Sequence, residues 1–326
     1  MANIGLIGLG RIGKIHFYNI LRLKNARLIA VADQSKTARR FAKVQGIRKV
    51  YSDYARLLED SSIDGVIIAL PTFLHSKCTI MAAECKKHIF LEKPLARNVK
   101  EGKEIVSKVQ KAGVKAMVGY PLRFSEFAKI KSEIDDGLLG DVVNAYGVNV
   151  WQGPFLSISN GSIPVRVPDW WFNPELTGGG ALIDLGCHMI NLLVWYFGDK
   201  ITSVKSILGY RFNMPFEDHA LCFIKFRQGI LALVNVGWYS VERIIKIELL
   251  GTAKSISMVA GSTKMSSHIL HTLGIRPLPE SQAFYNELDY FVKCLIDDHK
   301  PSPTAADALK DLEIISLAYK NKIVNT

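Results

Sequence analysis

The sequence lacks an apolar run long enough to cross a membrane. Its most apolar stretch, 181–198, is interrupted by Asp184, His188 and Asn191, whereas a spanning helix needs about 18 uninterrupted apolar residues. The amino terminus has no basic leader ahead of its apolar run and no small-residue cleavage site, so it does not resemble a secretory signal. We therefore expect a protein with no membrane partner and a cytoplasmic location.

Cysteine is scarce, and repeats and low-complexity linkers are absent. The 5 cysteines include no Cys-x-x-Cys pair and no metal-like spacing to histidine, which predicts reduced thiols and no metal site. With 48% hydrophobic and 22% charged residues, the composition is that of a folded globular protein and excludes a disordered or collagen-like chain. A length of 326 residues predicts two domains.

The net charge of +11 comes from the first part of the chain. Residues 1–120 hold 22 Lys and Arg against 9 Asp and Glu, while residues 121–326 hold 19 against 21. No basic run interleaved with aromatic residues and no nucleic-acid motif accompanies this excess. A small phosphorylated ligand together with ordinary solvated lysines accounts for this charge better than a polyanion does, although charge alone decides nothing, and we expect no nucleic-acid partner.

Residues 1–120 alternate short apolar runs with longer amphipathic stretches. The runs predict buried strands at 4–9, 28–32, 65–70, 88–91 and 116–119, with helices between them. Because parallel strands need crossover connections, this alternation predicts an α/β domain with a doubly wound parallel sheet.

Residues 121–326 follow a different pattern, with longer strands predicted at 142–150, 202–211, 219–226, 230–239, 244–250 and 255–259. Short turns that contain glycine join several of them, which predicts antiparallel connections and an α+β domain. Closing helices are predicted at 283–299 and 305–322. Packing of these last helices on the first domain is an alternative to packing within the second. The segment 152–169, rich in Gly, Ser and Pro, is long for a loop, and such loops often border a binding site.

A glycine motif, Gly8-x-Gly10-x-x-Gly13, follows the first predicted strand and opens a helix. Gly8 allows a tight turn, Gly10 lets the backbone approach a pyrophosphate, and Gly13 allows close packing of helix on strand. Asp33 ends the next strand, 20 residues after Gly13, where a carboxylate accepts hydrogen bonds from the adenosine ribose. We therefore expect NAD as the cofactor. NADP remains possible, because three cations lie near this carboxylate: Lys36, Arg39 and Arg40.

Two further patterns contain candidates for catalysis. Glu92-Lys93-Pro94 follows a predicted strand at the sheet edge where open α/β folds bind ligands; a surface ion pair is the alternative. Asp184 and His188 lie four residues apart after a run of three glycines. If 181–197 is a helix, they share one face. The surrounding residues are apolar, so both side chains are expected in the interior, either for catalysis or as satisfied core residues.

The motifs together resemble the glucose-fructose oxidoreductase and inositol dehydrogenase (Gfo/Idh/MocA) family. The resemblance rests on the order and spacing of segments 8–16, 71–75, 92–94, 119–124 and 178–188, and it covers essentially the whole chain. It implies an N-terminal Rossmann domain and a C-terminal domain with a large, mostly antiparallel open sheet that has helices on one face. That sheet is often used for oligomerisation in the family, so we expect a homodimer or homotetramer.

The resemblance also implies hydride transfer between a nicotinamide and a secondary ring hydroxyl of a sugar or cyclic polyol. Lys93 matches the family's catalytic lysine, His188 its acid/base and Asp184 the aspartate that orients the reacting hydroxyl. His16 and His75 match positions near the cofactor, with helix-end packing or capping as the alternative. The expected cofactor contacts are Gly8, Gly10, Arg11, Ile12, Gly13, Asp33, Pro71, His75, Glu92 and Lys93.

Two of the matched substrate positions depart from the family pattern. Arg123 matches an arginine near the substrate, although its usual neighbours are replaced by Pro121 and Leu122. Asn191 stands where many inositol-type members have aspartate, and its amide can still bond a substrate hydroxyl. The expected substrate contacts are Arg123, Trp171, Asp184, His188 and Asn191. Aromatic residues flank the long loop, and each is expected either to stack on a sugar ring or to pack in the core: Trp151, Phe155, Trp170, Trp171 and Phe172.

The expected mechanism follows the charge that develops in the transition state. As the carbinol hydrogen leaves as hydride, a neutral His188 accepts the hydroxyl proton, and the Lys93 cation stabilises the developing alkoxide. A nucleotide-sugar (UDP-sugar) 3-dehydrogenase is an alternative within this chemistry. Two alternatives of other classes are an NAD-retaining redox-neutral glycosidase and a non-catalytic NAD-binding sensor. The presence of Lys93, Asp184 and His188 together argues against a sensor, which needs no acid/base set.

Overall fold

The computed structural model describes residues 1–153, 168–240, 242–260 and 280–323, and its contacts divide the chain into two compact units. The first unit contains Met1–Pro121 and Glu280–Leu309, and the second contains Leu122–Pro279 and Lys310–Thr326. The predicted boundary after residue 120 lies beside this division, and the segment Glu280–Leu309, which contains the first predicted closing helix, belongs to the first unit. Phe155 and most of the predicted loop 152–169 lie outside the described residues.

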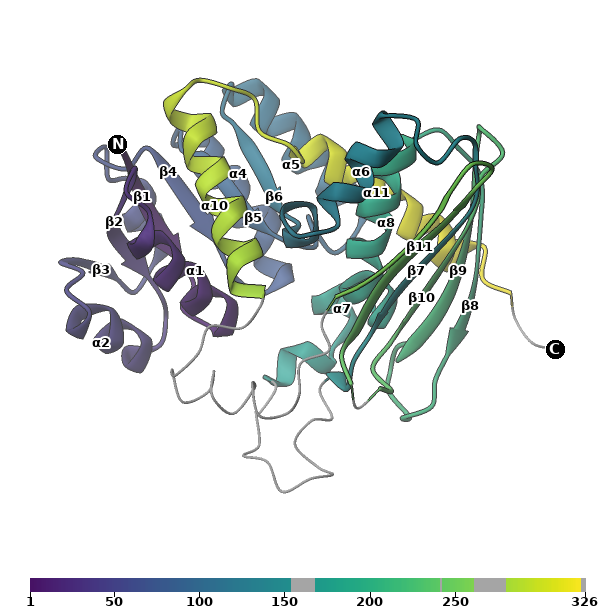
Figure 1. The fold of residues 1–326 in the computed structure, drawn as a ribbon. Coiled ribbons are helices and arrows are strands. Elements are labelled where there is room, and N and C mark those ends of the chain that lie inside the picture. Colours follow the sequence, from purple (N-terminus) through teal and green to yellow (C-terminus); the bar gives the residue numbers. More distant parts are fainter. Residues whose placement is uncertain (154–167, 241, 261–279, 324–326) are drawn as a thin grey trace. The chain divides into compact units, whose positions relative to one another are not determined.

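The first unit is built on a six-stranded sheet in the order β3-β2-β1-β4-β5-β6 (Figure 1). Every neighbouring pair of strands is parallel, which confirms the predicted α/β fold. The strand β3 was not predicted from the sequence. The strands are β1 (Ala2–Ile7), β2 (Ala26–Ala32), β3 (Lys49–Tyr51), β4 (Gly65–Ile68), β5 (His88–Glu92) and β6 (Ala116–Gly119).

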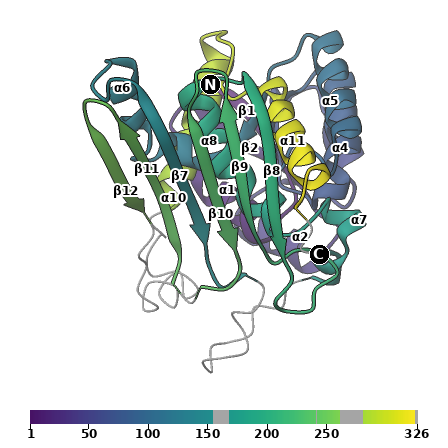
Figure 2. The same cartoon turned by 90° about the vertical axis from the view of Figure 1, so that its right-hand side faces the viewer.

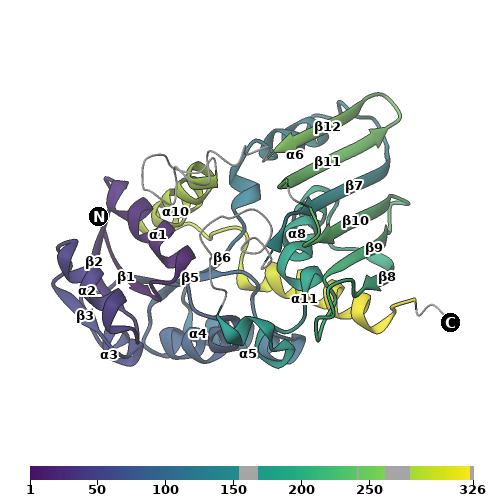
Figure 3. The ribbon, with the colours of Figure 1, turned by 90° about the horizontal axis from the view of Figure 1, so that it is seen from below.

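Helices cover both faces of this sheet, which explains why its inner strands are apolar throughout. Helix α1 (Arg11–Arg22) packs against α10 (Glu280–Ile296) on one face, and α4 (His75–Glu84) packs against α5 (Val99–Ala112) on the other (Figure 3). Shorter elements complete the unit: α2 (Lys36–Val44), α3 (Tyr54–Leu58), η1 (Thr72–Leu74) and η2 (Pro121–Phe124), whose last residues belong to the second unit.

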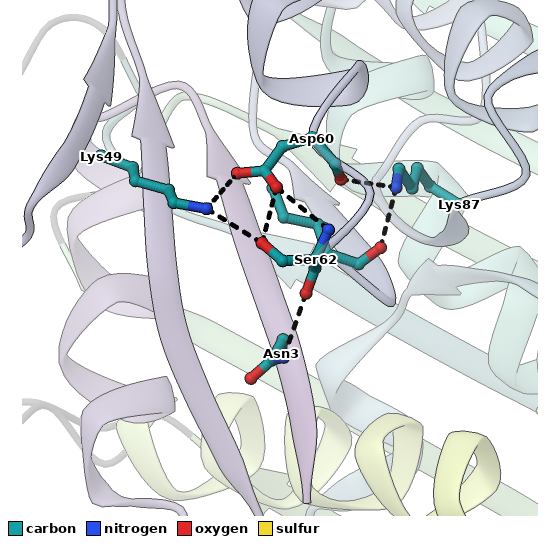
Figure 4. Close-up of polar contacts among 6 residues, drawn as sticks. Asn3, Lys49, Asp60, Ser62 and Lys87 are labelled. Carbon is teal, nitrogen blue, oxygen red and sulfur yellow. Dashed lines mark hydrogen bonds and ion pairs between the residues drawn. The ribbon is translucent and has the colours of Figure 1, made fainter.

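A polar network connects residues near the amino-terminal ends of several strands of the first sheet (Figure 4). The Lys49 ammonium donates to the Asp60 carboxylate at 2.6 Å and to the Ser62 hydroxyl at 3.0 Å. The Asn3 side chain donates to the Ser62 carbonyl, and the buried Lys87 ammonium donates to the Asp60 carbonyl. Hydrogen bonds from Lys49 and Ser62 lower the pKa of Asp60 to about 2. Ligands bind at the opposite, carboxyl ends of such strands, so this network stabilises the fold.

The second unit contains a six-stranded sheet in the order β12-β11-β7-β10-β9-β8 (Figure 2). Its neighbours are antiparallel except for β7 and β10, which are parallel, so the predicted mostly antiparallel sheet is confirmed. The insertion of β7 between β10 and β11 was not predicted. The strands are β7 (Val142–Val150), β8 (Ile201–Gly209), β9 (His219–Phe226), β10 (Leu231–Gly237), β11 (Ile244–Gly251) and β12 (Ser255–Ala260).

The two faces of this sheet differ. Alternate side chains of β9 and β10 are buried, and the inner side packs against the helical segment 182–197. Phe223 and Leu231 are 42% and 53% exposed on the other face, which no described helix of the second unit covers in Figure 2. The helices of the unit are α6 (Ala128–Asp135), η4 (Asp169–Phe172), α7 (Pro174–Thr177), the π turn η5 (Leu182–Gly186), α8 (Cys187–Phe197) and α11 (Ala305–Lys320), which begins in the first unit.

One helical segment, Pro174–Phe197, is long and apolar enough to cross a membrane by length and composition. The structure buries 83% of its most apolar window inside the protein. A core helix satisfies the same criterion, so this segment is weak evidence for a membrane span.

Candidate active site

The glycine motif forms the turn between β1 and α1, and the surroundings of its three glycines differ. Gly8 has a φ of +94°, and a Cβ there would lie 2.4 Å from the Ala69 carbonyl oxygen. A Cβ at Gly13 would lie 2.0 Å from the Gly8 carbonyl oxygen, so the helix approaches the strand only without a side chain. At Gly10 a Cβ would meet nothing within 4 Å. The backbone at Gly10 therefore borders open space, as the approach of a dinucleotide pyrophosphate requires.

The start of α1 is suited to an anion. Gly10 is the N-cap, no side chain in the described part of the chain caps this end, and the first turn has no acidic residue. The first-turn N–H groups, which include those of Arg11, Ile12 and Gly13, have no intrahelical acceptor and coincide with the positive end of the helix dipole. These groups fit the phosphates of the predicted cofactor.

Asp33 lies directly after β2 and is bound to the same turn. Its Oδ2 accepts a hydrogen bond from the Leu9 N–H at 2.7 Å, and its Oδ1 accepts one from the Ser35 N–H at 2.7 Å. These bonds orient the carboxylate, and each oxygen keeps a second lone pair that a ribose hydroxyl could use. The Arg39 guanidinium donates to the carbonyls of Asp33 and Gln34 at 2.8 and 2.7 Å. The backbone of the β2–α2 turn therefore holds this cation.

Lys93 follows the last residue of β5, and both of its chain neighbours are held by buried histidines. The Glu92 carboxylate pairs with His16 Nε2 of α1 at 2.5 Å. The Pro94 carbonyl oxygen lies 2.8 Å from His75 Nδ1. His16 is 0% exposed, His75 is 1% exposed and Glu92 is 6% exposed. The turn that carries Lys93 is thus fixed on both sides by residues of the first unit.

His75 connects two loops at the carboxyl edge of the first sheet. Its Nδ1 faces the Pro94 carbonyl and its Nε2 faces the Leu70 carbonyl at 2.9 Å. Burial lowers the pKa of His75, and a neutral imidazole has one N–H, so it donates to one of the two carbonyls. The loop that begins at Leu70 includes Pro71, which precedes η1. The cofactor contacts expected for Pro71 and His75 remain predictions, while a packing role for His75 is visible.

In the second unit, Asp184 and His188 form the accessible part of an otherwise buried helix start. Both are partly exposed, and every other residue of 181–190 is buried. The sequence places both side chains in the interior, which the structure corrects. Residues one helical turn apart share a face, so a carboxylate and an imidazole lie on the side of the helix that solvent and a ligand can reach.

The helix is not a regular α-helix where Asp184 lies. Residues Leu182–Gly186 form a π turn, η5, before α8 begins at Cys187. The Asn149 side chain of β7 donates to the Leu185 carbonyl at 3.3 Å, and the Cys187 thiol donates to the Asp184 carbonyl at 3.3 Å. Side chains thus supplement the backbone bonds of the π turn. Single π turns inside helices occur frequently at functional sites.

A buried glutamate that sequence reasoning missed anchors this helix. Glu217 Oε1 accepts hydrogen bonds from the N–H groups of Gly180 and Leu182 at 3.1 and 3.0 Å and from the Tyr319 hydroxyl at 2.7 Å. Glu217 is 2% exposed, and burial raises its pKa. It lies far from the helix in sequence, in the stretch before β9, so no local pattern identifies it.

The three glycines before the helix meet two requirements, a positive φ and close approach to Glu217. Gly178 ends α7 with a φ of +88°, and Gly179 has a φ of +151°. A Cβ at Gly180 would lie 2.0 Å from the Glu217 carbonyl oxygen. The glycine run is therefore a requirement of the backbone at the start of the helix that carries Asp184 and His188.

Arg123 and Asn191 belong to a buried network of the second unit. Arg123 Nε donates to Asn191 Oδ1 at 2.6 Å, and Asn191 Nδ2 donates to Asp311 Oδ2 at 2.6 Å. Arg123 is 8% exposed, and Asn191 and Asp311 are each 1% exposed. These contacts engage both ends of the Asn191 amide inside the protein. The low exposure of the Arg123 and Asn191 side chains thus gives no support to the substrate contacts that were expected for them.

Asp311 also explains why asparagine suits position 191. The Asn191 amide donates to a carboxylate at 2.6 Å. An aspartate at 191 would place two carboxylates at this distance, where one of them must take up a proton or separate.

Trp171 packs in an aromatic cluster of the second unit. Its ring centroid lies 4.7 Å from that of Trp238 and 6.3 Å from that of Phe216. Trp238 is 1% exposed, whereas the neighbouring Phe172 is 38% exposed. Trp171 is therefore partly a core residue, and sugar stacking by its remaining surface stays a prediction.

Comparison with known proteins identifies the family. The model of an oxidoreductase family with an NAD-binding Rossmann fold (GFO_IDH_MocA) matches residues 2–120, and the model of a GFO/IDH/MocA C-terminal domain matches residues 127–257. The chain belongs to the Gfo/Idh/MocA oxidoreductase family. The resemblance inferred from the motifs is thereby confirmed, and so are NAD as cofactor and the assignment to the oxidoreductases. Membership explains why the glycine motif and Lys93 lie in one unit and Asp184 and His188 in the other.

Individual Gfo/Idh/MocA relatives cover almost the whole chain. The scyllo-inositol 2-dehydrogenase (NAD(+)) of Bacillus subtilis (strain 168) is 33% identical, with 98% of this chain and 93% of that protein covered. Two solved structures have a similar fold. Scyllo-inositol dehydrogenase from Lactobacillus casei, with bound NAD(H) and scyllo-inositol, has a TM-score of 0.81 at 21% identity over 99% of this chain and 97% of that one. WlbA dehydrogenase from Bordetella pertussis, with NADH and UDP-GlcNAcA, has a TM-score of 0.84 at 21% identity over 98% and 95%.

Proposed function

We propose that this protein is an NAD-dependent dehydrogenase acting on a secondary ring hydroxyl of a cyclic polyol or sugar. The observation that carries the proposal is the accessible pair Asp184 and His188 on a helix whose other residues at 181–190 are buried. A partly exposed carboxylate and imidazole on a buried helix suit proton transfer to and from a substrate hydroxyl. The relative named scyllo-inositol 2-dehydrogenase, at 33% identity, supports an inositol or a similar ring as substrate.

The proposed roles follow from the chemistry of each side chain. His188 accepts the hydroxyl proton when the alcohol is oxidised and returns it in the reverse direction. Asp184 orients the hydroxyl from the same helix face. Lys93 supplies a positive charge that stabilises the alkoxide as it forms. When bound, NAD supplies the hydride acceptor, and residues of the β1–α1 turn and Asp33 hold it.

The proposed cofactor preference is NAD over NADP. The Asp33 carboxylate is fixed by two N–H groups, and its negative charge opposes a 2′-phosphate. Arg39 is the cation best placed to reverse this preference, but its guanidinium is bound to the carbonyls of Asp33 and Gln34.

A rate assay tests the function. The purified protein is mixed with NAD or NADP and a panel of inositols, aldoses and UDP-sugars, and nicotinamide absorbance is followed. We expect NAD reduction with one inositol or aldose, and a loss of at least about 100-fold in both His188→Ala and Lys93→Met with NAD binding retained. His219→Ala is the matched control, because this partly exposed histidine of the second unit pairs with its neighbour Asp218.

Other outcomes of the assay point to the alternative functions. Turnover confined to UDP-sugars would identify a nucleotide-sugar 3-dehydrogenase, which the basic first part of the chain also suits. No turnover with NAD bound in calorimetry would contradict the dehydrogenase and favour the redox-neutral glycosidase or the sensor. Full activity in both His188→Ala and Lys93→Met would contradict the assigned roles.

We also propose that the chain forms homo-oligomers through the open face of the second sheet and acts in the cytoplasm. Phe223 and Leu231 border a shallow hollow of about 350 Å³ on that face, and apolar surface of this kind marks association sites. Leu231→Arg should lower the mass measured by light scattering to that of a monomer; an unchanged mass would contradict this. The 5 free thiols, 4 of them buried, are consistent with a reducing compartment.

A further inference from the structure

Three ionisable side chains meet in the interior of the first unit. His16 comes from α1, Glu92 from the end of β5 and Glu287 from α10. One nitrogen or oxygen atom from each lies within 4.8 Å of the others. His16 and Glu287 are 0% exposed and Glu92 is 6% exposed. The cluster therefore joins three elements that are remote in sequence, and no local motif predicts it.

The surroundings of the cluster are apolar and tight. The His16 ring meets the edges of Phe90 and Phe284 at centroid distances of 5.2 and 5.6 Å. A Cβ at Gly119 would lie 3.0 Å from the Phe90 ring, closer than an ordinary contact, and 3.5 Å from Glu92 Oε1. Neither carboxyl oxygen of Glu287 has a hydrogen-bond partner within the described residues. Charges in such surroundings are costly unless they are paired.

The charge state of the cluster follows from this arrangement. His16 Nε2 pairs with Glu92 at 2.5 Å, and the cluster contains no lysine or arginine that could pair with Glu287. Burial and the negative charge of Glu92 raise the pKa of Glu287 well above its ordinary value. Full burial, the lack of a hydrogen-bond partner within the described residues and the nearby Glu92 carboxylate all favour the protonated form of Glu287. Burial lowers the pKa of the neighbouring His75, on which Glu92 and Lys93 act in opposite directions.

The cluster includes the residue that directly precedes the proposed catalytic lysine in the chain. Glu92 is the residue before Lys93, and His16 lies one turn beyond Gly13 on the helix whose start fits the cofactor. The His16–Glu92 pair therefore connects the cofactor helix to the lysine turn. A displacement of a catalytic group by about 1 Å can cost about 100-fold in rate.

We propose that His16, Glu92 and Glu287 act as one positioning unit for Lys93, in which Glu287 takes part as a neutral carboxylic acid. The His16–Glu92 pair holds the turn that contains Lys93 against α1. Glu287 packs beside this pair and, as a neutral acid, adds no second negative charge to it. This assignment gives Glu92 a positioning role in place of the direct cofactor contact expected from the sequence. It rests on the proposed role of Lys93.

Substitutions that keep size and change charge separate this role from a structural one. We expect Glu92→Gln to lower kcat about 10- to 100-fold with little change in KM for NAD. Glu287→Gln, which has the shape of the neutral acid, should keep kcat within about twofold. Thr79→Val is the matched control, because Thr79 is also 0% exposed and its hydroxyl has no partner among the described residues. Unchanged kcat in Glu92→Gln, or a large loss in Glu287→Gln, would overturn the proposal.

Two readouts do not depend on turnover. Infrared difference spectra between the wild type and Glu287→Gln at pH 7 should contain the carbonyl band of a protonated carboxyl group, and Thr79→Val should retain it. Acetylation of Lys93 by acetic anhydride, followed by mass spectrometry, should change rate several-fold in Glu92→Gln and not in Thr79→Val. If no substrate is found, these results still decide the proposal, whereas only the rate assay decides the function.

A metal ion is the competing occupant, because a histidine and two carboxylates can ligate one. Dialysis of the wild type against a chelator, followed by Zn²⁺, tests for it. We expect no change in the infrared band or in the acetylation rate. A change that Zn²⁺ reverses in the wild type but not in Glu287→Gln would overturn the proposal in favour of a metal site.

Discussion

Replacing Glu217 by leucine removes one acceptor from three donors at once. The Gly180 and Leu182 N–H groups and the Tyr319 hydroxyl all donate to Glu217 Oε1. Glutamine can present an amide oxygen at the same position and accept the same three bonds, whereas leucine cannot. The two substitutions have similar size, so their difference isolates the hydrogen bonds at the start of the helix that carries the proposed acid/base pair.

The expected loss is about 4 kcal/mol for Glu217→Leu. A buried donor left without an acceptor costs about 1–3 kcal/mol, and the two backbone N–H groups belong to the buried Gly180 and Leu182. The Tyr319 hydroxyl loses its acceptor as well, in surroundings whose burial raises the pKa of Tyr319, so it adds to this cost. For Glu217→Gln we expect a change of less than about 1 kcal/mol, because burial raises the pKa of Glu217 and the amide removes that desolvation penalty.

Urea unfolding followed by tryptophan fluorescence measures this difference in the second unit alone. All 5 tryptophans lie between residues 151 and 238, and this range belongs to the second unit. With a urea slope of about 2 kcal/mol per molar, Glu217→Leu should lower the midpoint by about 2 M. A shift below about 0.5 M, or an equal shift in Glu217→Gln, would refute the reasoning.

Two other substitutions test separate parts of the structure. Asp60 has a pKa lowered to about 2 by Lys49 and Ser62. A lowered carboxyl pKa adds stability above pH 4 that is lost as pH falls toward 2. Asp60→Asn should therefore cost about 1 kcal/mol at pH 7 and nothing near pH 2, and an equal cost at both pH values in thermal unfolding would contradict this. Asn191→Leu breaks the hydrogen bonds to Arg123 and Asp311 and should lower the free energy of unfolding by about 3 kcal/mol. Urea midpoints measure this loss. A variant that keeps its stability and raises only KM would instead support a substrate contact.

Much of the fold follows from local patterns in the sequence. The predicted bounds of β7 and β9 equal the observed ones, because alternating apolar residues bounded by turns define a strand locally. The strand β3 contains 3 residues, none of them buried, so no apolar run marks it. The parallel pairing of β7 with β10 joins residues 87 apart in the sequence, such as Asn144 and Leu231, and turn chemistry cannot predict such a pairing.

The candidate site was predictable only where its residues are close in sequence. The spacing of Asp184 and His188 predicts a shared face, but their exposure depends on the packing of the whole unit. The buried glutamates Glu217 and Glu287 act on segments far away in the chain. Their roles arise from burial and from tertiary neighbours, which a single sequence does not contain.

The division of the first unit into two chain segments affects the order in which the protein can fold on the ribosome. Its helix α10 begins about 160 residues after Pro121, which corresponds to a delay of about 10–30 s at usual rates of synthesis. During that interval the face of α1 that α10 covers, including His16, stays open. A fragment that ends at Pro121 should therefore aggregate, although it contains the whole glycine motif and all strands of the first sheet.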